Sequence, residues 1–510
     1  MTTDLTQATA TELLELYRTG AASPVEATRA VLDRIDALDP QLNAFCLVAV
    51  DEALASAAAS EIRWGRGAPV GSLDGVQTSI KDLVLTKGWP TLRGSRTVDP
   101  DQAWDVDAPA TARLREAGAV LIGKTTTPEF GCKGETNSAL TGITRNPWDP
   151  TRTSGGSSGG TAAAVAAGLG PLSIGTDGAG SVRIPAAFCG NVGLKPSFGR
   201  VPLYPMSPFG TVSHLGPLSI GTDGAGSVRI PAAFCGNVGL KPSFGRVPLY
   251  PMSPFGTVSH LGPHTMSVTD AALMTNVLKQ PDARDWTALP VDDRNYLDGL
   301  DDGIVGVRIA YSPTLGYATV HDEVAAAVAR AAEDLASEGA IVEAVDPGFD
   351  DPLEITTGLW FTGAWTLWNT LSPEQQAITD PDFAAEAELG SQLSNLDVQR
   401  LALRRGELGS HLRQFMQRFD LILTPSVAIP AFDARPAGSV PLTPENMLGW
   451  TPFSYPFNLT QQPAITVPCG LTDDGLPIGL QLVGPMFGDA LVLRAARAYE
   501  STHPVPRPSI

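Results

Sequence analysis

Residues 153–185 read TSGGSSGGTAAAVAAGLGPLSIGTDGAGSVRIP. Two serines of this stretch lie in glycine-rich turns, Ser157 within residues 155–160 and Ser181, 24 residues later, within residues 175–181. Glycines permit backbone conformations that larger side chains forbid, and the alanine-rich segment 161–167 predicts a helix between the two turns. Alone, a Gly/Ser run is also the composition of a flexible linker. The meaning of the stretch therefore depends on which other residues accompany it.

A lysine further upstream is the candidate partner of these serines. Lys81 lies in the segment Ser-Ile-Lys-Asp at residues 79–82, directly after an apolar, strand-like piece. A serine hydroxyl is a poor nucleophile until a base takes its proton. A lysine can be that base only where burial lowers its pKa toward neutrality. Taken alone, Lys81 would be an ordinary surface lysine, but together the three motifs predict nucleophilic catalysis.

Further motifs follow in a fixed order along the chain. They are GKTTTPEF at 123–130, TRNPW at 144–148, CGNVGLKP at 189–196, NLTQQP at 458–463 and GLQLVG at 479–484. With these motifs the sequence resembles the amidase signature family over most of its length. The resemblance implies an α/β fold, a single large domain with a central mixed, mostly internal β-sheet covered by helices. It also implies hydrolysis of a carboxylic amide through a serine acyl-enzyme, without metal or cofactor.

The same resemblance assigns the catalytic roles. Lys81 would be the neutral base, Ser157, which lies in a cis peptide in the family, would relay the proton, and Ser181 would attack the amide carbonyl. The family usually carries glycine where Ala179 stands, a difference that a methyl group could tolerate. Backbone N–H groups would stabilise the oxyanion, and these belong to Gly178, Ala179 and Gly180.

An identical repeat complicates this assignment. Residues 170–215 recur letter for letter as residues 216–261, whereas natural structural repeats drift. The identity implies a recent tandem duplication or an error in the gene sequence. We expect one amidase domain over residues 1–510 from which one copy is extruded. Ser227 repeats Ser181. A crossing after residue 181 leaves Ser181 in the site, whereas a crossing before it would substitute Ser227. The Pro/Gly-rich stretch 197–215 reads as a surface loop and is the expected exit, which favours Ser181.

Local patterns predict the secondary structure. Thr9 with Glu12 and Ser23 with Glu26 have the capping-box spacing and predict two helix starts. Segments 318–340 and 383–417 are also predicted to be helical, and residues 119–122 and 419–424 are predicted strands. This alternation of strands and helices favours an α/β fold. No composition break divides the chain, which favours one domain.

Composition narrows the setting of the protein. The 54 acidic and 35 basic residues give a net charge of -19, which argues against direct nucleic-acid or anionic-membrane binding. Five cysteines without a CxxC pair and a start without a signal-peptide pattern predict a cytoplasmic protein. The sequence has no run of about twenty apolar residues, so it predicts no membrane span. The sequence has no HExxH motif and no Cys/His cluster, so it predicts no metal site.

Two short patterns match other families without the context that those families need. Residues 118–125 fit the phosphate-loop pattern GxxxxGK[ST], but the four intervening residues read as a strand and cannot wrap a phosphate. Residues 155–159 fit GxSxG, but an α/β-hydrolase elbow needs a strand directly before Ser157 and a later histidine base. The preceding residues read as loop.

The substrate is less determined than the reaction. Aromatic residues in segments 360–368 and 450–457 suggest an apolar acyl pocket, although aromatic residues are more often core. The expected partner is a small-molecule amide, and a homodimer stays open. Two alternatives also stay open. One is a glutaminase that supplies ammonia within a tRNA-dependent amidotransferase complex, and the other is an inactive protein disrupted by the duplication.

Overall fold

The computed structural model describes residues 4–175, 215–216, 220–221, 238–241, 264–280, 293–504 and 507–509. Its strands are β1 (Phe45–Val48), β2 (Gln77–Lys81), β3 (Val120–Thr125), β4 (Asn137–Ser138), β5 (Gly142–Ile143), β6 (Leu172–Ile174), β7 (Leu215–Gly216), β8 (Ile220–Gly221), β9 (Val238–Lys241), β10 (His264–Thr265), β11 (Arg308–Tyr311), β12 (Ile341–Ala344), β13 (Leu421–Pro425), β14 (Ala464–Leu471) and β15 (Pro477–Val483). Its α-helices are α1 (Ala10–Thr19), α2 (Pro24–Leu42), α3 (Val50–Gly65), α4 (Pro109–Glu116), α5 (Gly159–Ala166), α8 (Val268–Leu278), α9 (Asp322–Ser337), α10 (Leu353–Trp368), α11 (Pro373–Gln376), α12 (Pro381–Ser391), α13 (Asn395–Phe415), α14 (Tyr455–Leu459) and α15 (Asp489–Thr502). A 3₁₀ turn, η1 (Glu129–Gly131), and a π-helical turn, η3 (Glu445–Gly449), complete the assignment.

Two mixed sheets carry the fold. The smaller has the order β1-β3-β2-β6, with β2 parallel to both of its neighbours and β1 antiparallel at the edge. The larger has the order β10-β9-β14-β15-β13-β11-β12, antiparallel from β10 to β13 and parallel beyond it. Every residue of β2, β3 and β13 is buried. The predicted α/β class with a mostly internal sheet is therefore confirmed.

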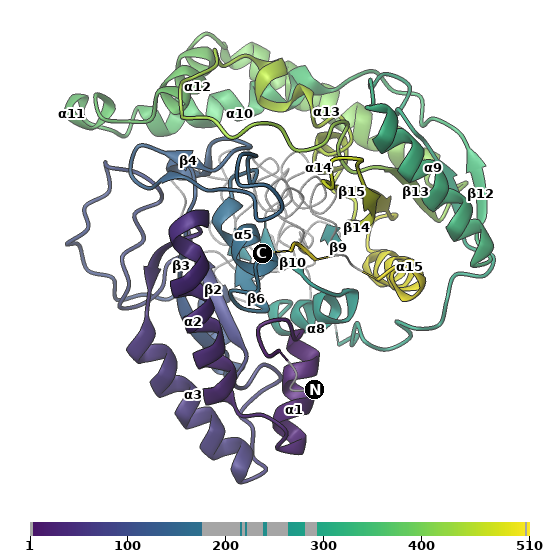
Figure 1. Cartoon of the computed structure of the whole chain (residues 1–510). Helices are drawn as coiled ribbons and strands as arrows, with labels where there is room; N and C mark the ends of the chain where they lie inside the picture. The colour runs from purple at the N-terminus through teal and green to yellow at the C-terminus, as the bar shows by residue number, and fades with distance from the viewer. Residues whose placement is uncertain are drawn as a thin grey trace.

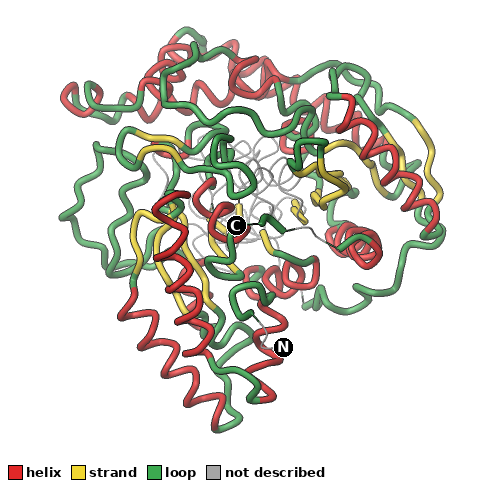
Figure 2. Tube along the Cα trace, viewed as in Figure 1, coloured by secondary structure: helices red, strands yellow, loops and turns green. Residues whose placement is uncertain are grey.

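Contacts at β10 join the two sheets. β10 lies against β6, the last strand of the smaller sheet. Next to it, the carboxylate of Asp270 on α8 accepts hydrogen bonds from the backbone N–H groups of Ala10 and Thr11, both at 3.0 Å. These bonds satisfy donors at the start of α1 that have no partner within that helix. Figure 1 shows α1, α2 and α3 at one end of the molecule and α10, α12 and α13 at the other. Most helices lie around the strands (Figure 2).

Helix α5 is the exception, because it lies in the middle of the molecule (Figure 1). Its sequence, GGTAAAVA, is buried at every position, and it packs against β2, β3 and β6. Small side chains allow this close approach: a Cβ on Gly160 would lie 2.2 Å from Thr126 Oγ1 and 2.4 Å from the Ala44 carbonyl oxygen. The alanine-rich segment therefore places its own N-terminus in the core.

Most local predictions are confirmed. Thr9 and Ser23 cap α1 and α2 with complete capping boxes, and the predicted helix at 318–340 is α9. The predicted strands are β3 and β13. The predicted helical stretch 383–417 is divided, because α12 ends at Ser391 and Ser394 begins α13 with a capping box of its own, formed with Asp397.

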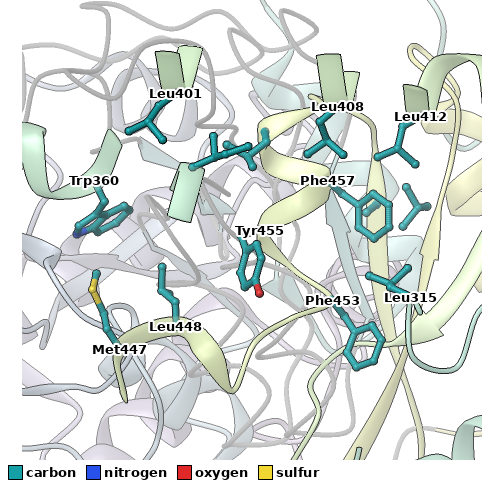
Figure 3. Packing of buried hydrophobic residues seen from close by; sticks show 14 of the residues in the cluster. Leu315, Trp360, Leu401, Leu408, Leu412, Met447, Leu448, Phe453, Tyr455 and Phe457 are labelled. Atoms are coloured by element: carbon teal, nitrogen blue, oxygen red, sulfur yellow. The ribbon is translucent and has the colours of Figure 1, made fainter. Parts of the chain in front are cut away.

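Most aromatic residues of the two segments belong to or pack against one buried cluster of the described residues, whereas Trp450 packs against another. Trp360 of α10, Leu401 of α13, Met447 of η3, and Tyr455 and Phe457 of α14 pack together in the first of these clusters (Figure 3). Trp360 Nε1 donates to Glu386 Oε2 at 3.0 Å, which satisfies the buried indole. In both segments these labelled side chains are core, which is the second of the two interpretations that the sequence allowed.

The strands also show how the two repeat copies contribute. β6 comes from the first copy, whereas β9, which pairs with β10 and β14, comes from the second. Residues 192–195 of the first copy have the same sequence as β9, so the sheet position for this segment is taken by the second copy. The second copy therefore supplies β9. The expected exit at 197–215 falls, apart from Leu215, outside the described residues and stays a prediction.

Candidate active site

Lys81 is the last residue of β2 and is fully buried. In the parallel pairing it lies opposite Thr125 of β3. Thr125 Oγ1 lies 2.7 Å from Thr161 Oγ1 of α5, which places this face of the sheet against the helix. The end of β2 therefore places Lys81 beside the N-terminus of α5.

Two serine hydroxyls meet the lysine there. Lys81 Nζ donates to Ser157 Oγ at 2.7 Å and to Ser158 Oγ at 2.8 Å. Ser157 and Ser158 are 1% and 0% exposed, so water does not compete for these contacts. The peptide bond between Gly156 and Ser157 is cis. The structure thus brings together Lys81 and Ser157 as the sequence predicted, and it adds Ser158.

Lys81 must be neutral before it can accept a proton from a serine hydroxyl. Burial in general works against an ammonium, because it removes the solvation that the charge needs. Lys81 is fully buried beside the N-terminus of α5, whose N-cap, Ser158, makes no side-chain capping hydrogen bond.

Neighbouring loops hold Ser157 in place. A Cβ on Gly156 would lie 2.3 Å from the backbone carbon of Glu135, so the two segments touch through bare backbone. A Cβ on Gly131 would lie 3.1 Å from Ser157 Oγ. The Glu135 carboxylate accepts hydrogen bonds from Arg435 Nη2 at 2.5 Å and from Arg435 Nε at 2.9 Å. This ion pair attaches the loop that follows β13 to the wall of the site.

A buried carboxyl group lies on the same wall. Glu129 accepts a hydrogen bond from Ser95 Oγ at 2.6 Å and another from the backbone N–H of Asp380, the N-cap of α12. Burial raises the pKa of Glu129 to about 7. Glu129 therefore joins η1, whose last residue is Gly131, to the helices at the far end of the molecule.

The remaining predicted site residues lie outside the described residues. These are Ser181, Ser227 and the predicted oxyanion-hole residues Gly178, Ala179 and Gly180. β6 is from the first copy and β9 from the second, and both candidate nucleophiles lie among the residues between them that the structure does not describe. The choice between Ser181 and Ser227 therefore stays a prediction.

The structure does not give the two short patterns the context that they require. Lys124 of the phosphate-loop pattern is a fully buried strand residue of β3. Among the described residues before Ser157, the preceding strand along the chain is β5, which ends at Ile143. Neither a phosphate-binding loop nor an α/β-hydrolase elbow has this arrangement.

Two residues of the site were missed by sequence reasoning. Ser158 lay within the Gly/Ser run but had no feature to distinguish it from Ser157. Gly131 has φ +77° and faces Ser157. A glycine after Glu-Phe is a weak signal, because only the fold shows which chain segment it meets.

Known proteins are similar to this chain over nearly its whole length. An acylamidase of Rhodococcus erythropolis is 34% identical over 508 residues, covering 97% of this chain and 95% of that protein. A glutamyl-tRNA(Gln) amidotransferase subunit of Chloroflexus aurantiacus is 33% identical, covering 98% of this chain and 97% of its own. A bacterial aryl acylamidase of the amidase signature family superposes with a TM-score of 0.81 at 29% identity, covering 98% and 96% of the two chains. The peptide amidase of Stenotrophomonas maltophilia gives a TM-score of 0.76 at 26% identity, covering 99% and 98%.

The family model for amidases matches residues 26–214 and again residues 212–493. The two matches overlap at residues 212–214, just before the boundary between the repeat copies at residues 215 and 216. Together with the buried Lys81–Ser157 contact, they show that this chain belongs to the amidase family, whose members are amidohydrolases that act on C–N bonds.

Proposed function

We propose that this amidase works with a Ser–Ser–Lys set in which Lys81 is the base and Ser157 the proton relay. The nucleophile is Ser181, or Ser227 where the second copy is used. The neutral amine of Lys81 takes the proton of Ser157 while Ser157 takes that of the nucleophile, whose oxygen attacks the amide carbonyl. Backbone N–H groups of residues 178–180 stabilise the oxyanion.

The second half of the reaction uses the same groups in reverse. Ser157 returns a proton to the leaving amine, which departs as the C–N bond breaks and an acyl-enzyme remains. Water, deprotonated through the same relay, then releases the acid. The single observation that supports this proposal is the 2.7 Å contact between two fully enclosed side chains, Lys81 and Ser157.

The proposed substrate class is small N-acyl amides. The relatives named acylamidase and aryl acylamidase support it. A glutaminase component of a tRNA-dependent amidotransferase complex is the second candidate, because the glutamyl-tRNA(Gln) amidotransferase relative is similar over nearly the whole chain. Hydrolysis of a simple acyl amide by the isolated chain would favour the first.

Labelling with a fluorophosphonate probe followed by tryptic mass spectrometry tests the proposal. Ser181 lies in the tryptic peptide 153–183 and Ser227 in the peptide 201–229, so the two copies are distinguishable. Fragmentation separates Ser157 from Ser181 within the first peptide. Label on Ser181 or Ser227 supports the mechanism and identifies the copy. Label on Ser157 alone contradicts the assigned roles, and an unlabelled protein without amidase activity supports the inactive alternative.

The organisation of the chain is also part of the proposal. We propose a single domain, supported by the contact between β6 and β10 and by the bonds of Asp270 to α1. In the part of the chain that the structure describes, no helix is both long and apolar enough to cross a bilayer. A cytoplasmic location and a homodimer remain predictions, and fractionation and light scattering would test them.

A further inference from the structure

A second lysine is buried beside Lys81, on the neighbouring strand. Lys124 of β3 pairs in register with Ile80, while Lys81 pairs with Thr125. Side chains of successive strand residues point to opposite faces of a sheet. Lys124 therefore lies on the face away from Ser157, and like Lys81 it is 0% exposed. The proposed chemistry gives this lysine no role.

The ammonium of Lys124 is enclosed by the chain that follows β2. Its Nζ donates to the Val84 carbonyl oxygen and to Thr91 Oγ1, both at 2.7 Å, and lies 3.8 Å from Asp82 Oδ1. The Asp82 carboxylate in turn accepts the backbone N–H groups of Leu92 at 3.2 Å and Gly94 at 3.3 Å. Residues 82–94 are thus folded around one charge.

This loop is connected to the relay serine on the other side of the sheet. The backbone N–H of Phe130 donates to the Arg93 carbonyl oxygen at 2.7 Å. A Cβ on the next residue, Gly131, would lie 2.7 Å from Leu83 Cδ1 and 3.1 Å from Ser157 Oγ. Gly131 is therefore fitted between the loop and the relay hydroxyl. A shift of the loop moves a direct neighbour of Ser157.

The charges around Lys124 make stability a weak explanation for it. The charged and titratable groups that act on it are Asp82, Cys46 and Arg93. Burial lowers the pKa of Lys124 to about 8, against the attraction of Asp82. A buried ion pair commonly adds little stability over apolar side chains of similar volume.

We propose that Lys124 is a positioning residue for the proton relay. By holding residues 82–94 it sets η1, and through Gly131 it fixes Ser157 at its short distance from Lys81. The proposal rests on the assignment of Lys81 and Ser157 under the proposed function. Its effect is on geometry, because the described partners of Lys124 Nζ belong to residues 82–94, on the face of the sheet away from Ser157.

The test compares Lys124→Met with Lys124→Met/Asp82→Asn. Both remove the two short hydrogen bonds of Lys124. The double variant also removes the Asp82 charge that the single variant leaves without Lys124, so we expect it to regain part of the lost stability, although Arg93 then loses the attraction of Asp82. We expect kcat for an acyl amide to fall about 10²-fold in both, with little change in KM, because misplacement by about 1 Å has that effect. Leu335→Ala in α9, fully buried in a separate cluster, is the control that loses stability without losing kcat.

Two outcomes would overturn the proposal. One is a kcat that recovers with stability in the double variant. The other is a kcat that is unchanged at its pH optimum while the fall of kcat/KM at low pH moves to a different pH. In that case Lys124 would act on the charge of the site and not on the position of Ser157. Thr91→Val keeps the charge of Lys124 and removes the hydrogen bond from Lys124 together with the one that Thr91 Oγ1 donates to the Val84 carbonyl oxygen at 3.3 Å. It serves where the other variants do not fold; we expect a smaller fall in kcat, and an unchanged kcat would also overturn the proposal.

A crystal structure of Lys124→Met tests position without activity. We expect Lys81 Nζ and Ser157 Oγ to separate beyond hydrogen-bond distance, about 3.5 Å. An unchanged 2.7 Å contact contradicts the proposal. An inactive wild-type enzyme whose contact is nevertheless lost in the variant would refute the proposed function and leave the positioning role standing.

Discussion

Ser157 and Ser158 offer a matched pair of substitutions, because Lys81 Nζ contacts both hydroxyls at nearly the same distance. The contacts are 2.7 Å and 2.8 Å, and both serines are buried. Ser157→Ala and Ser158→Ala each remove one buried hydrogen bond from the same lysine. Ser158 is the N-cap of α5 without a capping side-chain bond, so its replacement does not remove a cap.

The expected losses separate stability from catalysis. Each variant leaves a buried donor with one partner fewer, which costs about 1–3 kcal/mol of unfolding free energy. Only Ser157 is proposed to transfer a proton, and a positioned acid–base group contributes about 10²–10⁴-fold to the rate. At about 1.4 kcal/mol per factor of ten, this is about 3–5 kcal/mol of activation free energy. We therefore expect similar melting temperatures but very different activities.

The assay is hydrolysis of a chromogenic acyl anilide, with the acyl-enzyme burst measured separately from steady-state turnover. The burst rate should fall about 10²–10⁴-fold in Ser157→Ala. The burst rate of Ser158→Ala should stay close to that of the wild type. Thermal unfolding of both variants provides the control for folding. Equal losses of burst rate in the two variants, or a fast burst in Ser157→Ala, would refute the assignment of Ser157 as the relay.

Three further predictions follow from the structure. The pKa of Glu129 is raised from 4.5 to about 7, so between these pH values the folded state holds a proton on Glu129 that the unfolded state has lost, and the free energy of unfolding falls as pH rises. Glu129→Gln should remove about 3 kcal/mol of this pH dependence, measured by urea unfolding. Parallel plots of unfolding free energy against pH for the wild type and the variant would contradict the prediction. Gly131→Ala should slow hydrolysis because its Cβ meets Leu83 and Ser157, whereas Gly88→Ala, with a similar positive φ and open space around it, is the control that should stay active. Deletion of residues 216–261 leaves 464 residues (510 minus 46), and because the copies are identical it keeps the sequences of β6 and β9. Soluble yield and melting temperature should be higher for the deletion variant than for the full chain. Equal values for the two proteins would show that the second copy lowers neither solubility nor stability.

The sequence by itself determined the local elements and the chemistry. Capping boxes at Thr9 and Ser23 located helix starts because the partners lie three residues apart. The same signal at Ser394, with Asp397, was readable but missed, and it divides the stretch 383–417. The order of the motifs indicated the family. In each case the information lies within a few residues, so it can be read without the fold.

Only the tertiary structure decided which residues meet. The contact between Lys81 and Ser157 joins positions 76 residues apart, and Ser158, Gly131 and the support from Lys124 depend on how β2, β3 and α5 pack. The repeat makes the limit plainest. Its two copies have identical local preferences, so no sequence pattern could choose between them. The choice of the second copy for β9 came from pairing with β14, because strand pairing is a contact between distant segments that local sequence does not encode.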